Sequence, residues 1–308
     1  MKKTIISLGS VIILALLLLG LGSCKAKPAA GEAKPLVLAS IHPYELLLSA
    51  LLSPEYDVRS IIPTGASPHT WSPNPSDLVG MEEASLILIN GLGLENSIKS
   101  GLERHADKTL RVEDILAIDA YENDHPEGEE PQAEEGHEHL GPDPHIWVSA
   151  NNMVSLLKAL EPELKTRFPQ LADSITSRSS RLLTSLEAAR DKIYSEASTF
   201  EGKGIITYHN SFSLFLMENG LQVVATVQSS PGTEPSAREM TELGRIISAY
   251  KLKAIFVEPQ MSRRSAEVLA SEFNLRILEL DPLASSTKMK TLPDFYLQNW
   301  AAVKQAFE

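Results

Sequence analysis

Short apolar runs alternate with longer amphipathic segments along most of the chain, which is typical of βα units built around parallel sheets. The strand candidates fall into two groups, one in each half of the chain: 36–39, 58–62, 85–89 and a weaker run at 115–118, then 204–208, 222–227, 254–257 and 275–280. Because both groups show the same alternation, we predict an α/β fold with two related βα lobes, each containing a parallel sheet.

The segment between the two groups predicts one long helix. Residues 168–199 contain no glycine, their one proline, Pro169, suits a first helical turn, and their apolar residues recur at helical spacing. About thirty helical residues span about 45 Å. We therefore expect residues 166–200 to form a stiff helix that links an N-terminal lobe, 35–165, to a C-terminal lobe, 201–308. The alternative is an ordinary surface helix that belongs to one lobe.

The N-terminal segment predicts export from the cytoplasm. Two lysines precede an apolar run at 5–21, which ends in "LGSC" at Cys24, the single cysteine of the chain. This tetrad resembles a bacterial lipobox, which implies a signal peptide at 1–23, a lipid on Cys24 and a tether at 24–34. An uncleaved membrane anchor is the alternative, since about 20 apolar residues span a bilayer. In either case the folded part lies outside the cytoplasmic membrane.

Residues 119–142 differ from the rest of the chain. Between 121 and 140 there are eight acidic residues, three histidines (His125, His137 and His139) and no lysine or arginine. With almost nothing apolar to bury, this segment predicts a mobile acidic loop, which either collects metal ions or serves as a solvated linker. The whole chain has a net charge of −12, and such an acidic protein is a poor candidate for nucleic-acid binding.

Four residues are candidate metal ligands. His69 lies in a loop after the second predicted strand, His145 follows a Pro-Asp-Pro run, and His209 and Asp281 each follow a predicted strand directly. Open α/β sheets bind ligands at the carboxyl ends of their strands. Three imidazoles and one carboxylate suit tetrahedral zinc and leave no position for a catalytic water. Taken singly, each histidine also fits a surface or capping role.

Six motifs strengthen the metal-site interpretation: "GASPHTW", "DPHIW", "YHNSFSLF", "SSPGTEPSARE", "FVEPQ" and "LELDPL". In this order they resemble the motifs of metal-binding lipoproteins that serve bacterial ABC importers, in particular the zinc-uptake branch. The resemblance runs from about residue 36 to the C-terminus. It implies two lobes joined by a long rigid helix and a metal cleft between them, with His69 and His145 from the first lobe and His209 and Asp281 from the second.

The residue at position 209 favours zinc over manganese. Manganese-selective relatives usually place a carboxylate there, whereas this chain has His209. Imidazole nitrogen suits zinc, and carboxylate or carbonyl oxygen suits manganese. We predict Zn²⁺ as the bound ion, with manganese or another transition metal as the alternative.

Other polar residues have weaker claims to the site. His42, after the first predicted strand, either lines the cleft or polarises the start of the next helix. Glu258, in "FVEPQ", either hydrogen-bonds a ligand imidazole or serves a helix N-terminus. Glu234 and Arg238 are further pocket candidates, although a predicted capping box, Ser236 with Glu239, accounts for most of their motif.

The sequence therefore predicts a monomeric, extracytoplasmic, lipid-anchored protein that binds zinc with high affinity and delivers it to an ABC permease. No G-x-S-x-G or H-E-x-x-H motif is present, and we expect no enzymatic activity. Two rival functions remain open at this point. One is a surface adhesin or interaction lipoprotein, which would bind its partner regardless of metal, and the other is a zinc-dependent hydrolase, which would need a water molecule on the metal.

Overall fold

The structure is a computed structural model that describes residues 33–118, 143–228 and 232–308. The predicted signal peptide, the lipid site Cys24, most of the tether and the acidic loop with its three histidines lie outside the described residues. Pro35–Glu308 form one compact unit. Within the described part of the chain, no helix is both long enough and apolar enough to cross a membrane.

The first lobe contains a four-stranded parallel sheet in the order β2-β1-β3-β4. Its strands are β1 (Leu36–Ala39), β2 (Asp57–Ser60), β3 (Leu86–Ile89) and β4 (Thr109–Arg111). Its helices are α2 (His42–Leu52), α3 (Pro75–Glu83), α4 (Lys99–Glu103) and α5 (Val112–Ile115). Along β1, Val37 and Ala39 face the main core, while Leu38 joins a smaller cluster with Met81 of α3. Burial on both faces explains why the two central strands, β1 and β3, are wholly apolar.

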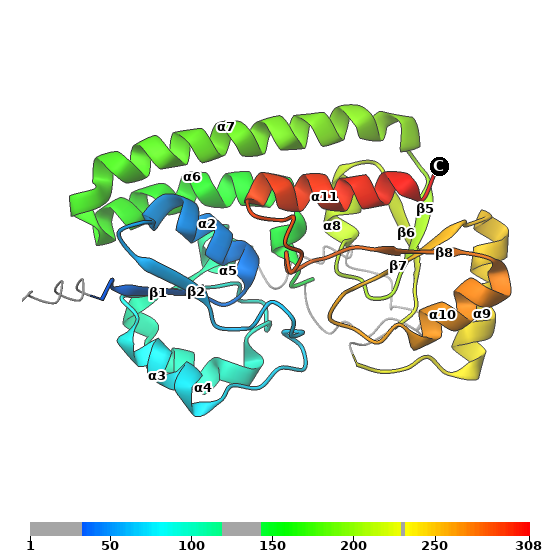
Figure 1. The fold of residues 1–308 in the computed structure, drawn as a ribbon, viewed down its shortest axis with the longest axis horizontal. Coiled ribbons are helices and arrows are strands. Elements are labelled where there is room, and N and C mark those ends of the chain that lie inside the picture. Colours follow the sequence, from blue (N-terminus) through cyan, green and yellow to red (C-terminus); the bar gives the residue numbers. More distant parts are fainter. Residues whose placement is uncertain (1–32, 119–142, 229–231) are drawn as a thin grey trace, which may run out of the picture. The chain divides into compact units, whose positions relative to one another are not determined.

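The second lobe repeats this topology in the order β6-β5-β7-β8, again with all strands parallel. Its strands are β5 (Gly204–Thr207), β6 (Gln222–Thr226), β7 (Ala254–Val257) and β8 (Arg276–Glu279). Its helices are α8 (Ser213–Glu218), α9 (Ala237–Tyr250), α10 (Arg264–Phe273) and α11 (Leu292–Gln305). The same strand order in both sheets confirms the predicted α/β fold with two related lobes (Figure 1).

The prediction of a strand at 115–118 was wrong. The fourth strand is β4, which pairs with β3 through Leu88 and Leu110, whereas α5 occupies 112–115 and Ala117 has a φ of 50°. A three-residue edge strand with a threonine and an arginine around one leucine gives no detectable apolar pattern. The apolar side chains at 115, 116 and 118 instead pack partly buried against the main core.

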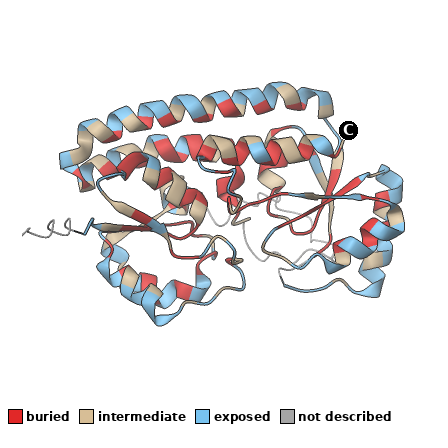
Figure 2. Ribbon diagram, in the orientation of Figure 1, coloured by how far each residue is buried: buried red, intermediate tan, exposed pale blue. Residues whose placement is uncertain are grey.

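The long linking helix is present as α7 (Ala172–Ala197), preceded by a short 3-10 turn that begins at Pro169. Residues 166–167 are the end of α6 (Ala150–Arg167), which turns back into α7. The helix α7 packs against α6, against α2 of the first lobe and against α11 of the second (Figure 1). Its apolar stripe, Ile175, Leu182, Leu186 and Ile193, is buried, while the opposite face is exposed (Figure 2). The helix therefore serves both lobes and is not a surface helix of one.

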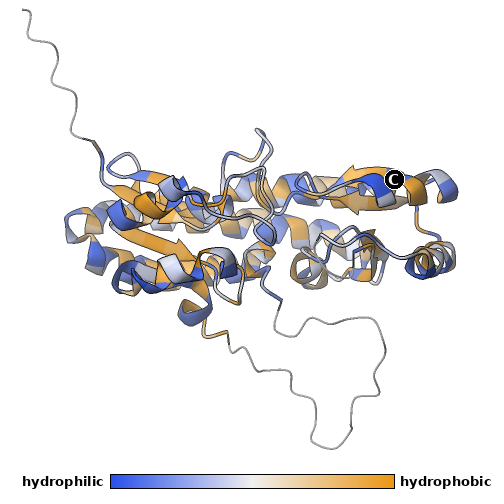
Figure 3. Ribbon diagram, turned by 90° about the horizontal axis from the view of Figure 1, so that it is seen from below, coloured by the Kyte–Doolittle hydropathy of each residue, from blue (hydrophilic) through white to orange (hydrophobic). Residues whose placement is uncertain are grey.

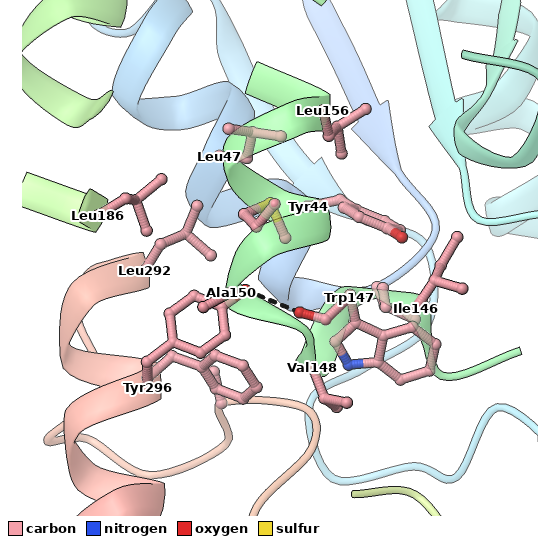
Figure 4. Packing of buried hydrophobic residues seen from close by; sticks show 14 of the residues in the cluster. Tyr44, Leu47, Ile146, Trp147, Val148, Ala150, Leu156, Leu186, Leu292 and Tyr296 are labelled. Atoms are coloured by element: carbon pink, nitrogen blue, oxygen red, sulfur yellow. Dashed lines mark hydrogen bonds between the residues drawn. The ribbon is translucent and has the colours of Figure 1, made fainter. Parts of the chain in front are cut away.

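One continuous hydrophobic core extends through both lobes. It includes side chains from β1, α2, α6, α7, α8 and α11, and the apolar strands lie between layers of helices (Figure 3). At its centre the indole of Trp147 and the ring of Tyr296 are buried, and Tyr296 Oη donates a hydrogen bond to the Trp147 carbonyl at 2.8 Å (Figure 4). Because close-packed interiors resist deformation, this shared core limits how far the lobes can separate.

Candidate metal centre

Three histidines from distant parts of the chain lie close together. The ring centroids of His69 and His145 are 5.3 Å apart, those of His69 and His209 are 5.1 Å apart, and those of His145 and His209 are 4.8 Å apart. One ring nitrogen of each lies within 4.8 Å of the other two. The structure thus brings together three of the four predicted ligands.

The local fold explains where each histidine lies. His209 follows β5 and His69 lies in the loop between β2 and α3, so both come from the carboxyl ends of parallel strands. His145 starts a short 3-10 turn before α6, and the preceding Pro144 carbonyl accepts a hydrogen bond from Asn90 Nδ2 at 2.8 Å. His145 and His209 are buried, whereas His69 is exposed. The exposed histidine therefore marks the side from which an ion can enter.

The spacing of one nitrogen pair suits a tetrahedral ion. His69 Nε2 and His145 Nε2 lie 3.2 Å apart. Two nitrogens that each bind zinc at about 2.0 to 2.1 Å in a tetrahedron are separated by about 3.3 Å. His209 Nε2 is buried and has no hydrogen-bond partner among the described residues. Since a buried nitrogen without a partner carries a desolvation cost, its lone pair is suited to an ion rather than to the protein.

Carboxylates hold the opposite nitrogens of two of these rings. His209 Nδ1 lies 3.1 Å from Glu258 Oε1, and the same oxygen accepts a hydrogen bond from Ser211 Oγ at 2.6 Å. His145 Nδ1 lies 2.7 Å from Asp143 Oδ1. An ionised carboxylate only accepts hydrogen bonds, so each ring carries its proton on Nδ1 and presents an unprotonated Nε2.

The electrostatic environment keeps the His145 ring neutral. Burial alone would raise the pKa of Asp143, but hydrogen bonds from the His145 ring and the Ser213 hydroxyl outweigh burial and hold that pKa at about 2. The pKa of His145 is lowered, because the cost of burying a charged ring exceeds the stabilisation by Asp143. At neutral pH this pair is a carboxylate beside a neutral imidazole, the form that binds metal.

The hollow beside the three rings has a volume of about 10 Å³ and is also lined by Trp147, Glu258 and Gln260. That volume suits a single ion or water molecule and is far below the roughly 300 to 1,000 Å³ of sites for organic ligands. The hollow therefore has room for a single ion or water molecule but not for an organic substrate.

The family model of the zinc-uptake complex component A, periplasmic, abbreviated ZnuA, matches residues 37–306. The chain belongs to the ZnuA family. The match includes both lobes, the linking helix and all four predicted ligands, which confirms the family resemblance seen in the sequence motifs.

The individual relatives of this ZnuA-family chain have low sequence identity to it, but the similarity extends over most of its length. A candidate metal-binding protein of Thermotoga maritima is 27% identical over 273 residues, which are 88% of this chain and 92% of that protein. The zinc-binding lipoprotein AdcA of Streptococcus pneumoniae is 25% identical over 287 residues, which are 92% of this chain but 56% of AdcA, so the chain spans about half the length of AdcA. The periplasmic zinc-binding protein TroA of Treponema pallidum shares the fold, with a TM-score of 0.74 at 22% identity over 89% of this chain and 99% of that one.

Asp281, the fourth predicted ligand of this ZnuA-family chain, does not join the three-histidine group in the structure. It is buried after β8, and its backbone is held by Asn299 of α11, which accepts from the Asp281 amide at 2.8 Å. Its carboxylate accepts hydrogen bonds from four groups: the amides of Leu283 and Ser286, Ser285 Oγ and Gln260 Nε2.

Of the weaker sequence candidates, Glu258 contacts His209 and lines the hollow, whereas His42, Glu234 and Arg238 are not among its lining residues. His42 is the first residue of α2, and its Nδ1 lies 3.1 Å from Glu45 Oε2. Glu234 is exposed and accepts a hydrogen bond from Ser265, and Arg238 is exposed on α9. The predicted capping box of Ser236 and Glu239 is present at the start of α9.

Sequence reasoning missed two residues that touch the site. Asp143 orients His145, and Gln260 lines the hollow and contacts Asp281. The motif "DPHIW" contained the signal for Asp143, since a carboxylate two residues before a histidine can reach its Nδ1. The motif "FVEPQ" ends in Gln260, but its partners lie 21, 25 and 196 residues away, so no local pattern indicated its role.

Proposed function

We propose that this chain binds Zn²⁺ outside the cytoplasmic membrane through His69, His145, His209 and Asp281 and passes it to an ABC permease. The observation that supports this most strongly is the convergence of three imidazoles whose nitrogens lie within 4.8 Å of one another, with two of the rings held in the metal-binding tautomer by carboxylates. Asp281 contacts Gln260, which lines the hollow beside this group, and its carboxylate would complete a closed four-ligand site.

Zinc is the cargo that this donor set favours. Three imidazole nitrogens form most of the site, and nitrogen-rich sites suit zinc, whereas manganese prefers carboxylate and carbonyl oxygens. The His209–Glu258 contact supports this choice, since a hydrogen-bonded carboxylate makes the imidazole a stronger donor. A site with more oxygen ligands would shift the preference towards manganese.

Release follows from the way the ligands are divided between the lobes. His209 and Asp281 belong to the second lobe, while His69 lies on a loop of the first. The shared core and α7 restrict wide opening, so small displacements of these loops are the means by which a permease would weaken the site. Lipid attachment at Cys24 would keep the protein at the membrane surface beside that permease.

Titration of metal-free full-length protein with zinc and with manganese tests this function. We expect tight zinc binding at one main site and a loss of zinc affinity of at least about 100-fold in His209→Glu, with a smaller loss or a gain for manganese. His105→Ala, which alters a histidine of the first lobe away from the site, is the matched control and should leave both affinities unchanged. If His209→Glu binds zinc as tightly as the parent protein does, the ligand assignment is wrong.

A further inference from the structure

Gln260 connects the fourth proposed ligand to the loop that carries the first one. It follows β7 in the second lobe and lines the hollow beside the three histidines. Its Nε2 lies 3.3 Å from three acceptors: the Thr64 carbonyl in the His69 loop, Asp281 Oδ1 and Ser285 Oγ. Gln260 is thus in contact with both sides of the site.

The Gln260 amide is poorly satisfied in this position. Its two N–H bonds are shared among three acceptors, and each distance is longer than the usual 2.9 to 3.0 Å. Its Oε1 is buried and accepts no hydrogen bond among the described residues. By contrast, the Asn299 amide behind Asp281 makes hydrogen bonds of 2.8, 3.1 and 3.0 Å. Gln260 is therefore held weakly, whereas Asn299 is held firmly.

The Asp281 carboxylate is fully occupied by donors. Oδ1 accepts from Gln260 Nε2 and from the Leu283 amide at 3.1 Å, and Oδ2 accepts from Ser285 Oγ and the Ser286 amide, both at 2.9 Å. A carboxylate has about four lone-pair positions, so a metal ion can bind only in place of one of these donors. The Gln260 contact is the longest of the four, and its donor is the one outside the 281–286 loop.

We propose that Gln260 is the exchangeable partner of Asp281, which gives up its hydrogen bond to Oδ1 when that oxygen binds the metal ion. The proposal rests on the proposed function, because it takes Asp281 as a zinc ligand. It makes Gln260 a positioning residue that sets affinity: its amide competes with zinc for Oδ1 and keeps binding weaker than the four ligands alone would allow. Its contact with Thr64 couples the same exchange to the loop that carries His69.

A double-mutant cycle on the full-length protein tests this proposal. Zinc affinity is measured by competition with a chromophoric chelator for the parent, Gln260→Ala, Asp281→Asn and the double variant. We expect Gln260→Ala to tighten zinc binding about 5-fold, which corresponds to one competing hydrogen bond, and to have no tightening effect in the Asp281→Asn background. Gln260→Met, which keeps the side-chain volume without the N–H donors, should reproduce Gln260→Ala. The control Gln228→Ala removes another amide directly after a strand of this lobe and should leave affinity unchanged.

The remaining outcomes separate this proposal from the proposed function. Unchanged or weaker binding in both Gln260 variants overturns the exchange, as does an equal effect in both Asp281 backgrounds. An Asp281→Asn variant that binds zinc as tightly as the parent overturns the exchange and leaves the three-histidine site intact. A parent protein that binds no zinc overturns the proposed function itself.

Discussion

His145 Nδ1 lies 2.7 Å from Asp143 Oδ1, and the second oxygen of that carboxylate accepts a hydrogen bond from Ser213 Oγ of the other lobe at 2.5 Å. One side chain thus orients a proposed ligand and ties it to the neighbouring lobe. Asp143→Asn should lower zinc affinity about 10- to 100-fold, because an amide does not fix the ring tautomer as a carboxylate does. Chelator competition measures the change.

The matched control for Asp143 is Asp191→Asn, since Asp191 is paired with its neighbour Arg190 on the exposed side of α7. This variant should bind zinc as the parent does. Equal affinities for the parent and Asp143→Asn would show that Asp143 plays no part in orienting His145.

The Tyr296 hydroxyl stabilises the segment that carries His145. It is buried and donates to the Trp147 carbonyl at 2.8 Å, with the Ser149 carbonyl at 3.3 Å. Tyr296→Phe should reduce the free energy of unfolding by about 1 to 2 kcal/mol, because it removes the hydroxyl that donates to the buried Trp147 carbonyl. Urea denaturation monitored by tryptophan fluorescence measures this, with exposed Tyr250→Phe as the control. If the two variants lose equal stability, this hydrogen bond contributes nothing specific.

The Glu196 carboxylate should make the stability of the protein depend on pH. It accepts hydrogen bonds from Lys304 Nζ at 2.6 Å and Trp300 Nε1 at 2.8 Å, which join α7 to α11, and these contacts lower its pKa. Because the pKa of Glu196 is lower in the folded state, its ionised form stabilises the fold when the pH is above the pKa of the unfolded state, about 4.3. This stabilisation is lost as the pH falls through the pKa of the folded state. Glu196→Gln should therefore be less stable at neutral pH and lose less stability between about pH 5 and 3. Exposed Glu272→Gln is the control, and parallel pH profiles for Glu196→Gln and the parent would contradict the assignment.

The acidic segment 119–142, which the sequence predicts to be a loop, should affect the rate of zinc capture. Its carboxylates and His125, His137 and His139 would raise the local ion concentration, so deleting residues 122–139 should slow zinc acquisition at low zinc and leave the main-site affinity nearly unchanged. Stopped-flow zinc binding checks this against a control in which a Gly-Ser segment of equal length replaces the loop. If the deletion changes neither the binding rate nor the stoichiometry, the collecting role is wrong.

Local patterns in the sequence determined the elements of this fold. Apolar runs marked seven of the eight strands in the described part of the chain, and apolar spacing after Pro169 marked α7, because the burial of strands and helices leaves a repeat of known period in adjacent residues. The missed strand, β4, is an edge strand with one apolar residue and so leaves no such repeat. The motifs around His69, His145 and His209 indicated metal chemistry, although their separations fit no compact pattern.

The tertiary structure alone decided how these residues act together. It brought His69 Nε2 to within 3.2 Å of His145 Nε2, directed the Glu258 carboxylate at His209, and surrounded Asp281 with four donors, one of them Gln260. Such contacts join residues up to 196 positions apart, and their geometry depends on how two sheets pack around one shared core. A short-range repeat carries no information about that packing, so the sequence indicated candidate metal ligands but not which partners hold them.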